Sequence, residues 1–495
     1  MQSDPGSRDG VTAVGCRDRA PDRKALVNLE QKRLVTAVCV ITGVSFLVSA
    51  SLQFLITPML TDLGLSNEEA GTALAVPSVG ALLIVFAAGR VGDRVGHRRV
   101  LEWAAVPFVV GSLLVAAAPG IAFVSLGLLF AGAAATALQI VALGLLQTAV
   151  PDGPSRIAAF TSFGMVFPTV YLAVPVLTGW LVGVAPWRIV PLAWAVCGVA
   201  VPLLAAHLIP RPEPARAVGE LWTPTFAGVA LAAAVQLVNH GHDHGWTTPG
   251  TALWLAVLVL AVATVLVLRR ATRAASLSLR LLRSRHLVLL LVAVALIAMS
   301  SSLTYITLGL EYLYGQTVLG AAVWLIPANA AAILGAKVVA DRLMLWWGVA
   351  RAGQAMLGGL TLSLLSLVLL GGSSPMAQLI LSSALISLFA VGGITIVNAA
   401  VMSGAPPDET GMVSSYRGAA SALGAALGIV IVGAAVTTAV AATSSVPAGA
   451  IPDPAALATG LQANGLVGAG LAAVAAAAFT WAFGRQSGRG LTSVR

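Results

Sequence analysis

One stretch decides the fold of this chain: Gly89-Arg90-Val91-Gly92-Asp93-Arg94-Val95-Gly96-His97-Arg98-Arg99-Val100-Leu101. It is basic and rich in glycine, and it separates two long apolar runs that cover residues 70–88 and 101–118. An arginine at the centre of a bilayer costs about 3 kcal/mol or more. The stretch therefore predicts a turn at a membrane surface, and its arginines indicate the cytoplasmic side.

The composition is typical of an integral membrane protein, because 58% of the 495 residues are hydrophobic and only 9% are charged. The net charge of +9 comes from basic residues in short loops beside apolar runs, so it does not indicate nucleic-acid binding. The three cysteines are too few and too scattered for a disulfide framework or a zinc site. No catalytic triad or nucleotide-binding loop appears, so we expect neither an enzyme nor an ATP-driven pump, and no cofactor or metal.

Apolar runs of about twenty residues, the length that crosses a bilayer, predict fourteen transmembrane helices in groups of six, two and six. We expect an all-α integral membrane protein with two six-helix bundles and two extra spans. The predicted units are a disordered cytoplasmic tail (1–33), an N-terminal six-helix bundle (34–209), a linker with two extra transmembrane helices (210–286), a C-terminal six-helix bundle (287–484) and a cytoplasmic tail (485–495).

Basic residues alternate between loops in a way that supports an even number of spans. They gather in both tails and in every second loop, whereas the opposite loops contain almost none apart from Arg188. This alternation predicts that both termini are cytoplasmic. The excess of arginine over lysine and the abundant alanine are typical of a high-GC bacterial genome, so we expect a multi-pass protein of the bacterial inner (cytoplasmic) membrane.

A faint internal repeat links the two bundles. The segment Lys337-Val338-Val339-Ala340-Asp341-Arg342-Leu343 follows the tenth span as Gly89 to Val95 follow the second, so Asp341-Arg342 matches Asp93-Arg94. Such a repeat indicates two structurally related halves.

The glycine-rich loop resembles the signature loop of the major facilitator superfamily, Gly-x-x-x-Asp-Arg-x-Gly-Arg/His-Arg-Arg. The layout of residues 34–484 is similar to the fourteen-span drug:proton antiporter family, which also carries Trp-Arg at the start of span six, as Trp187-Arg188 do here, and a small-residue span thirteen, as in 411–428. The resemblance implies the major facilitator fold and a secondary transporter that works by alternating access. It implies export of lipophilic or cationic small molecules, such as drugs and antibiotics, in exchange for protons.

The resemblance also assigns roles to residues of the loop. It implies a gating role, without substrate contact, for Gly89, Asp93, Arg94, Gly96, Arg98 and Arg99. We expect Asp93 to cap a helix end and to pair with an arginine across the interface between the halves, holding one conformation and then releasing it.

Two features separate the chain from exporting relatives. Their span five carries Gly-Pro-x-x-Gly-Gly, of which Pro175 and Gly179 remain, so either an antiporter-like kink or a generic proline bend is expected there. Relatives also place an aspartate in span one and an arginine in span four. Neither is present in the matching stretches 48–53 and 128–132, which puts the usual proton path in doubt.

Ionisable residues inside spans are expensive, so each is a candidate for function. Glu311 is predicted to bind and release protons, or else to be a solvated acid at the outer end of span nine. Arg417 is predicted to counter a carboxylate or hold an anionic substrate, or else to extend to the cytoplasmic face. Lys337, near the inner end of span ten, is expected to extend to that face as well.

Uncharged polar residues suggest a substrate cavity. Gln139, Asn329 and Asn398 lie on spans that line the central cavity in the superfamily, and Trp324 offers a stacking surface. Hydrogen bonding between helices is the competing interpretation. The stretch His240-Gly241-His242-Asp243-His244 has potential metal ligands, but its compact spacing favours a solvated turn.

Two other functions remain open at this stage. One is a dedicated exporter of a metabolite or lipid with weak or no proton coupling. The other is a membrane sensor that transports nothing.

Overall fold

The computed structural model is all-helical, and it describes residues 23–64, 67–151, 153–209, 220–271, 280–300, 303–316, 318–406, 409–444 and 453–484. Eleven helical stretches in this part of the chain are long and apolar enough to cross a membrane. The fourteen-span count remains a prediction. One of the eleven, Ile326–Leu369, is 44 residues long, and the chain turns inside it at Gly348, where φ is +74°. Glycine adopts this left-handed backbone without a steric penalty.

The N-terminal group of helices comprises α1 (Arg23–Leu63), α2 (Asn67–Val95), α3 (His97–Ala116), α4 (Ile121–Ala149), α5 (Pro154–Gly164), α6 (Val166–Val184) and α7 (Ile189–Leu208). Helix α1 begins at Arg23, inside the segment 1–33 for which disorder is predicted. Residues 1–22 lie outside the described part, and so does the tail 485–495.

Two further helices, α8 (Trp222–His244) and α9 (Pro249–Ala271), follow the first group. They pack against each other, and α8 also packs against α2 and α16, one helix from each half. Apolar side chains from all three, Leu82, Ala232, Val235 and Ala426, form a small separate core. Helix α8 is thus attached to both halves, and α9 packs against α8.

The C-terminal group is more broken than the first. It comprises α10 (Arg285–Met299), α11 (Leu303–Leu308), the π-helix η2 (Gly309–Leu313), α12 (Val318–Trp324), α13 (Ile326–Leu334), the π-helix η3 (Gly335–Val339), α14 (Ala340–Leu365), α15 (Met376–Ser403), α16 (Thr410–Thr443) and α17 (Pro454–Phe483), with short 3₁₀ turns η1 (Leu281–Arg283) and η4 (Ser366–Leu369). Helix starts have local causes: the Asp453 carboxylate accepts the Ala456 N–H at 3.2 Å, and Pro454 takes the first helical position.

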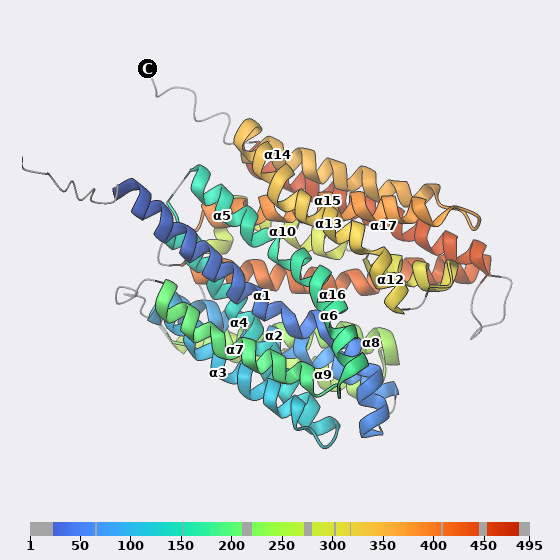
Figure 1. Ribbon diagram of the computed structural model, residues 1–495, viewed down its shortest axis with the longest axis horizontal. Coiled ribbons are helices and arrows are strands. Elements are labelled where there is room, and N and C mark those ends of the chain that lie inside the picture. Colours follow the sequence, from blue (N-terminus) through green and yellow to red (C-terminus); the bar gives the residue numbers. More distant parts are fainter. Residues whose placement is uncertain are drawn as a thin grey trace, which may run out of the picture.

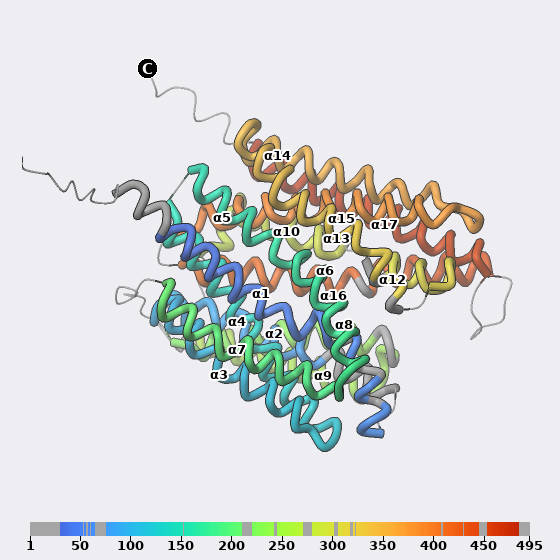
Figure 2. The backbone as a smooth tube through the Cα atoms, viewed as in Figure 1, coloured from blue at the N-terminus to red at the C-terminus, as the bar shows by residue number. Residues whose placement is uncertain are grey.

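Figure 1 shows the two groups side by side, with α3, α4 and α7 on one side, α14, α15 and α17 on the other, and α16 between them. The first helix begins and the last ends at the same side of the bundle, as the tube in Figure 2 also shows. We call this side the termini end and the opposite side the far end. Many large apolar side chains on the outer helices are exposed, Val196 and Leu369 by more than 70%, as expected of a surface that meets lipid.

Candidate functional site

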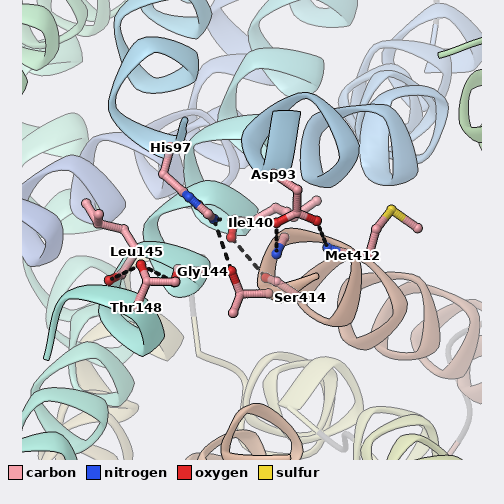
Figure 3. Close-up of polar contacts among 10 residues, drawn as sticks. Asp93, His97, Ile140, Gly144, Leu145, Thr148, Met412 and Ser414 are labelled. Atoms are coloured by element: carbon pink, nitrogen blue, oxygen red, sulfur yellow. Dashed lines mark hydrogen bonds and ion pairs between the residues drawn. The ribbon is translucent and has the colours of Figure 1, made fainter. Parts of the chain in front are cut away.

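The two halves are joined at the termini end, where the loop after α2 meets the start of α16. The Asp93 carboxylate accepts hydrogen bonds from the backbone N–H of Gly411 at 2.7 Å and of Met412 at 2.9 Å (Figure 3). All three residues are buried. The first N–H groups of a helix have no partner within the helix, and the helix dipole favours a negative charge beside them. Asp93 therefore caps a helix of the other half.

The position of Asp93 matches the sequence prediction of a helix cap, but the described partners across the interface are backbone N–H groups and not an arginine. Two basic side chains of its own half lie near it. Arg90, one turn earlier on α2, lies within electrostatic range, and His97 Nε2 is 4.0 Å from the carboxylate.

Two serines of α16 add hydrogen bonds to backbone carbonyls of the N-terminal half. Ser414 Oγ donates to the Ile140 carbonyl of α4 at 3.0 Å, and Ser415 Oγ donates to the Val85 carbonyl of α2 at 2.7 Å. Both serines are buried. Sequence reasoning missed them, and the only signal was their place in the small-residue stretch that begins at Gly411.

The remaining gating residues of the loop differ in exposure. Gly96 has φ of +94° at the start of α3, a backbone that glycine adopts without strain. Arg94 and Arg99 are exposed. Arg98 donates to Glu102 at 2.9 Å and to the Ile209 carbonyl after α7 at 2.8 Å, so it braces the N-terminal half internally.

Lys337 provides a second connection between the halves. It lies in the π-helix η3, and its Nζ donates across the interface to three acceptors of α5: the Ala158 carbonyl at 3.3 Å, Thr161 Oγ1 at 3.4 Å and Ser162 Oγ at 2.9 Å. Its side chain therefore points into the other half rather than out to the membrane surface as the sequence analysis expects.

The two charged residues proposed for proton coupling lie in different surroundings. Glu311 is partly exposed in the π-helix η2, near the far end. Arg417 lies two turns inside α16, and its Nε is buried with no hydrogen-bond partner in the described part of the chain. No ion pair within 4.0 Å joins the two among the described residues.

The candidate cavity residues differ in how their polar groups are used. Asn398 is buried, and its Oδ1 has no hydrogen-bond partner among the described residues. Asn329 donates to the Leu325 carbonyl of its own helix at 3.3 Å. Trp324 is 41% exposed and donates to Gln316 Oε1 at 3.1 Å, while Gln139 is half-buried.

The helix of span five is interrupted, but not at Pro175, the proline that matches the family pattern. Helix α6 runs through Pro175 and Gly179 without interruption. The break between α5 and α6 falls at Met165, three residues before Pro168. Proline has no N–H and its ring clashes with the carbonyl four residues earlier, so Pro168 accounts for this break.

At the far end, an ion pair ties α1 to the start of α7. Asp62 accepts hydrogen bonds from Trp187 Nε1 at 2.9 Å and from Arg188, whose guanidinium also donates to the Ala118 carbonyl at 3.1 Å. These hydrogen bonds, the one from Trp187 first, lower the pKa of Asp62 below its usual value. All these residues belong to the N-terminal half.

The histidine-rich stretch after residue 239 gives no metal site in the part that can be described. No group of three possible ligands is present among the described residues. The side chains of His242, Asp243 and His244 lie outside that part.

Known proteins resemble the chain both in sequence and in fold. It is 28% identical over 208 residues to "Multidrug resistance protein B homolog" of Mycobacterium tuberculosis, covering 41% of this chain and 38% of that protein. It is 26% identical over 258 residues to "Cephamycin export protein CmcT" of Amycolatopsis lactamdurans, covering 51% and 53%. The match thus spans about half or less of these relatives.

Among solved structures, the human organic anion transporter MFSD10 (TETRAN) superposes with a TM-score of 0.61 at 15% identity, covering 91% of this chain and 99% of that chain. This similarity concerns the fold alone. The family model described as Major Facilitator Superfamily matches residues 38–429, which is well over half of the sequence. The chain therefore belongs to the Major Facilitator Superfamily.

Proposed function

We propose that this transporter exports lipophilic or cationic small molecules, drugs or antibiotics among them, by proton antiport and alternating access. The observation that carries the proposal is the pair of contacts between the halves: Asp93 of α2 binds the start of α16, and Lys337 of η3 binds α5. In the described part of the chain, the hydrogen bonds that join the halves gather at the termini end. Alternating access requires contacts of this kind, which hold one end closed and then release it.

The direction of closure depends on which side of the membrane the termini occupy. The basic residues in the tails and alternate loops support termini in the cytoplasm of a bacterial cell. The contacts of Asp93 and Lys337 then close the cytoplasmic side, and substrate leaves from the far end.

Lipophilic substrates are supported by the scarcity of polar groups in the spans. Gln139, Asn329 and Asn398 are too few to replace the hydration shell of a sugar. Relatives named for multidrug resistance and for cephamycin export support efflux over uptake. Proton antiport supplies enough energy, because moving one charge through 100 mV is worth about 2.3 kcal/mol. At about 1.4 kcal/mol per tenfold, one proton sustains a gradient of roughly 40-fold.

A test of the proposal is to reconstitute the purified protein in liposomes with a trapped pH indicator and an imposed pH gradient. Lipophilic cations and antibiotics are then added one at a time, with protein-free liposomes as the control. We expect at least one compound to trigger proton movement. If no compound of a broad panel changes the internal pH although the protein is correctly inserted, proton antiport of such compounds is contradicted.

A second candidate function is dedicated export of one metabolite or lipid with weak or no proton coupling. The observation in its favour is the absence of the span-one aspartate and the span-four arginine from stretches 48–53 and 128–132. The same liposomes distinguish the two, because a dedicated exporter moves its substrate at the same rate with and without the pH gradient.

A further inference from the structure

Lys337 occupies a special place in the internal repeat of the sequence. When Asp341-Arg342 is aligned with Asp93-Arg94, Lys337 falls at the position of Gly89, one helical turn before the acid. Both positions face a helix of the opposite half. Gly89 lies against Gly411 of α16 with no room for a side chain, whereas Lys337 extends toward α5.

The acceptors on α5 are arranged in advance for an ammonium group. Thr161 Oγ1 and Ser162 Oγ donate their own protons to the Ala158 carbonyl, at 3.1 Å and 2.7 Å. The lone pairs of the two hydroxyl oxygens are therefore free to accept from Lys337. An ammonium has three N–H donors, and three acceptors lie within 3.4 Å of Nζ.

The charge of Lys337 is held by neutral groups. Within the described residues no carboxylate lies within 4.0 Å of its Nζ. A cation at membrane depth is costly without compensation, and the three acceptors of α5 supply such compensation to this half-buried ammonium. Its backbone is also unusual, because it lies in a π-helix, a form that is rare and often found at functional sites.

We propose that Lys337 is a second latch of the gate at the termini end, opposite in charge to Asp93. On one side of the interface an anion, Asp93, binds the N–H donors of α16. On the other side a cation, Lys337, binds the hydroxyl and carbonyl acceptors of α5. Opening the termini end requires both to release, so each latch sets part of the open-to-closed ratio. This inference rests on the alternating-access transport proposed above.

The chain contains its own reporter for this gate. The Cys39 thiol of α1 is half-buried and lies close enough to Lys337 to be affected by its charge. With Cys16→Ser and Cys197→Ser in place, Cys39 is the single cysteine. A membrane-impermeant maleimide, applied to the termini side of inside-out vesicles, then measures how often this end is open. Neither a substrate nor a pH gradient is needed.

The decisive variant is Lys337→Met, which keeps the length of the side chain but removes its charge and its donors. We expect Cys39 modification to be about tenfold faster, the effect of losing hydrogen bonds worth about 1.4 kcal/mol. Thr161→Val with Ser162→Ala is expected to act in the same direction, and to add little when combined with Lys337→Met. Lys32→Met, at an exposed lysine of α1, is the matched control and is expected to change nothing.

A far-end reporter separates a latch from loosened packing. In a Cys39→Ser background, Trp324→Cys places a thiol at an exposed far-end position. If Lys337 is a latch, Lys337→Met accelerates labelling at Cys39 and slows it at position 324, because opening one end closes the other. Acceleration at both positions would overturn the proposal, and so would unchanged Cys39 labelling in both Lys337→Met and the α5 double variant, which keeps the lysine charge beside the thiol. If Lys337→Met does not fold, the α5 double variant gives the same test. Absence of transport in liposomes contradicts the proposed function and leaves these labelling results intact.

Discussion

Gly89 and Gly411 meet backbone to backbone across the interface between the two halves. A Cβ added to either glycine would lie far inside the contact distance of the other's carbonyl oxygen. Helices that approach so closely require small residues at the crossing. The crossing brings the start of α16 within reach of Asp93 and also allows Ser415 to reach the Val85 carbonyl.

Substitution of Gly89 by alanine is expected to force the halves apart at the termini end. The added Cβ would meet both the Ser415 hydroxyl and the Gly411 backbone, and the backbone cannot move aside like a side chain. We therefore expect increased labelling of Cys39 from that side and reduced transport. The matched control is Gly92→Ala, whose Cβ would meet Val141 at 3.5 Å and His97 at 3.6 Å, ordinary contact distances. Equal behaviour of the two variants would show that the close approach at Gly89 is not needed for closure.

Replacing Asp93 tests the charge of the cap separately from its shape. Asp93→Asn keeps an oxygen that can accept one N–H, whereas Asp93→Ala leaves the N–H groups of Gly411 and Met412 without a partner. Hydrogen bonds to a charged group are worth about 1.5–3 kcal/mol each, so we expect the alanine variant to open the termini end more than the asparagine variant. The order is checked by Cys39 labelling rates. Labelling equal to the wild type in both variants would remove Asp93 from the gate.

Lys337 shows where sequence reasoning reached its limit. The loop predicts the place of Asp93, because its glycines, acid and basic residues keep a fixed spacing around a helix end. For Lys337 the sequence offers a lysine near the end of a span, which usually extends to the membrane surface, and a faint repeat position that names no partner. Its partners on α5 lie about 175 positions earlier and carry no charge, so no local pattern indicates them.

The sequence of span five contains two prolines, Pro168 and Pro175, and either could mark a helix break. Pro175 draws attention because it matches a family pattern, whereas Pro168 matches none. The structure breaks at Met165 and continues through Pro175. Whether a proline bends or ends a helix depends on the packing around it, and Gly164 at this break lies directly against Thr395 of α15. Contacts between halves of this kind cannot be derived from one segment alone.

The far-end contact of Asp62 predicts a defined pH dependence of stability. Since hydrogen bonds from Trp187 and Arg188 lower the pKa of Asp62 from its usual 3.8, the carboxylate stabilises the fold above that pH. The contribution is lost as the pH falls through the lowered value. Thermal unfolding of the wild type and of Asp62→Asn is expected to differ at neutral pH and to converge in acid. A difference that persists at the lowest pH would mean that the charge of Asp62 is not what stabilises this contact.

Glu311 is a carboxylate at the far end of a span. We predict that transport uses it to carry protons. It lies on the π-helix η2 and is partly exposed. We expect Glu311→Gln to abolish substrate-triggered proton movement in liposomes, because a neutral amide cannot bind and release a proton. Folding is expected to be unchanged, with a size-exclusion profile and a Tm like those of the wild type.

The matched control for Glu311→Gln is Glu102→Gln, at an acid of α3 that is already paired with Arg98 at 2.9 Å. Substrate-triggered proton movement in the Glu102→Gln variant is expected to stay close to that of the wild type. A second measurement, substrate efflux without a pH gradient, identifies what Glu311 does. If efflux down the substrate gradient persists in Glu311→Gln while proton movement is lost, Glu311 couples the two fluxes. If coupling is unchanged in this variant, the proton is carried by another group, and Glu311 is a solvated acid at the far end of its span.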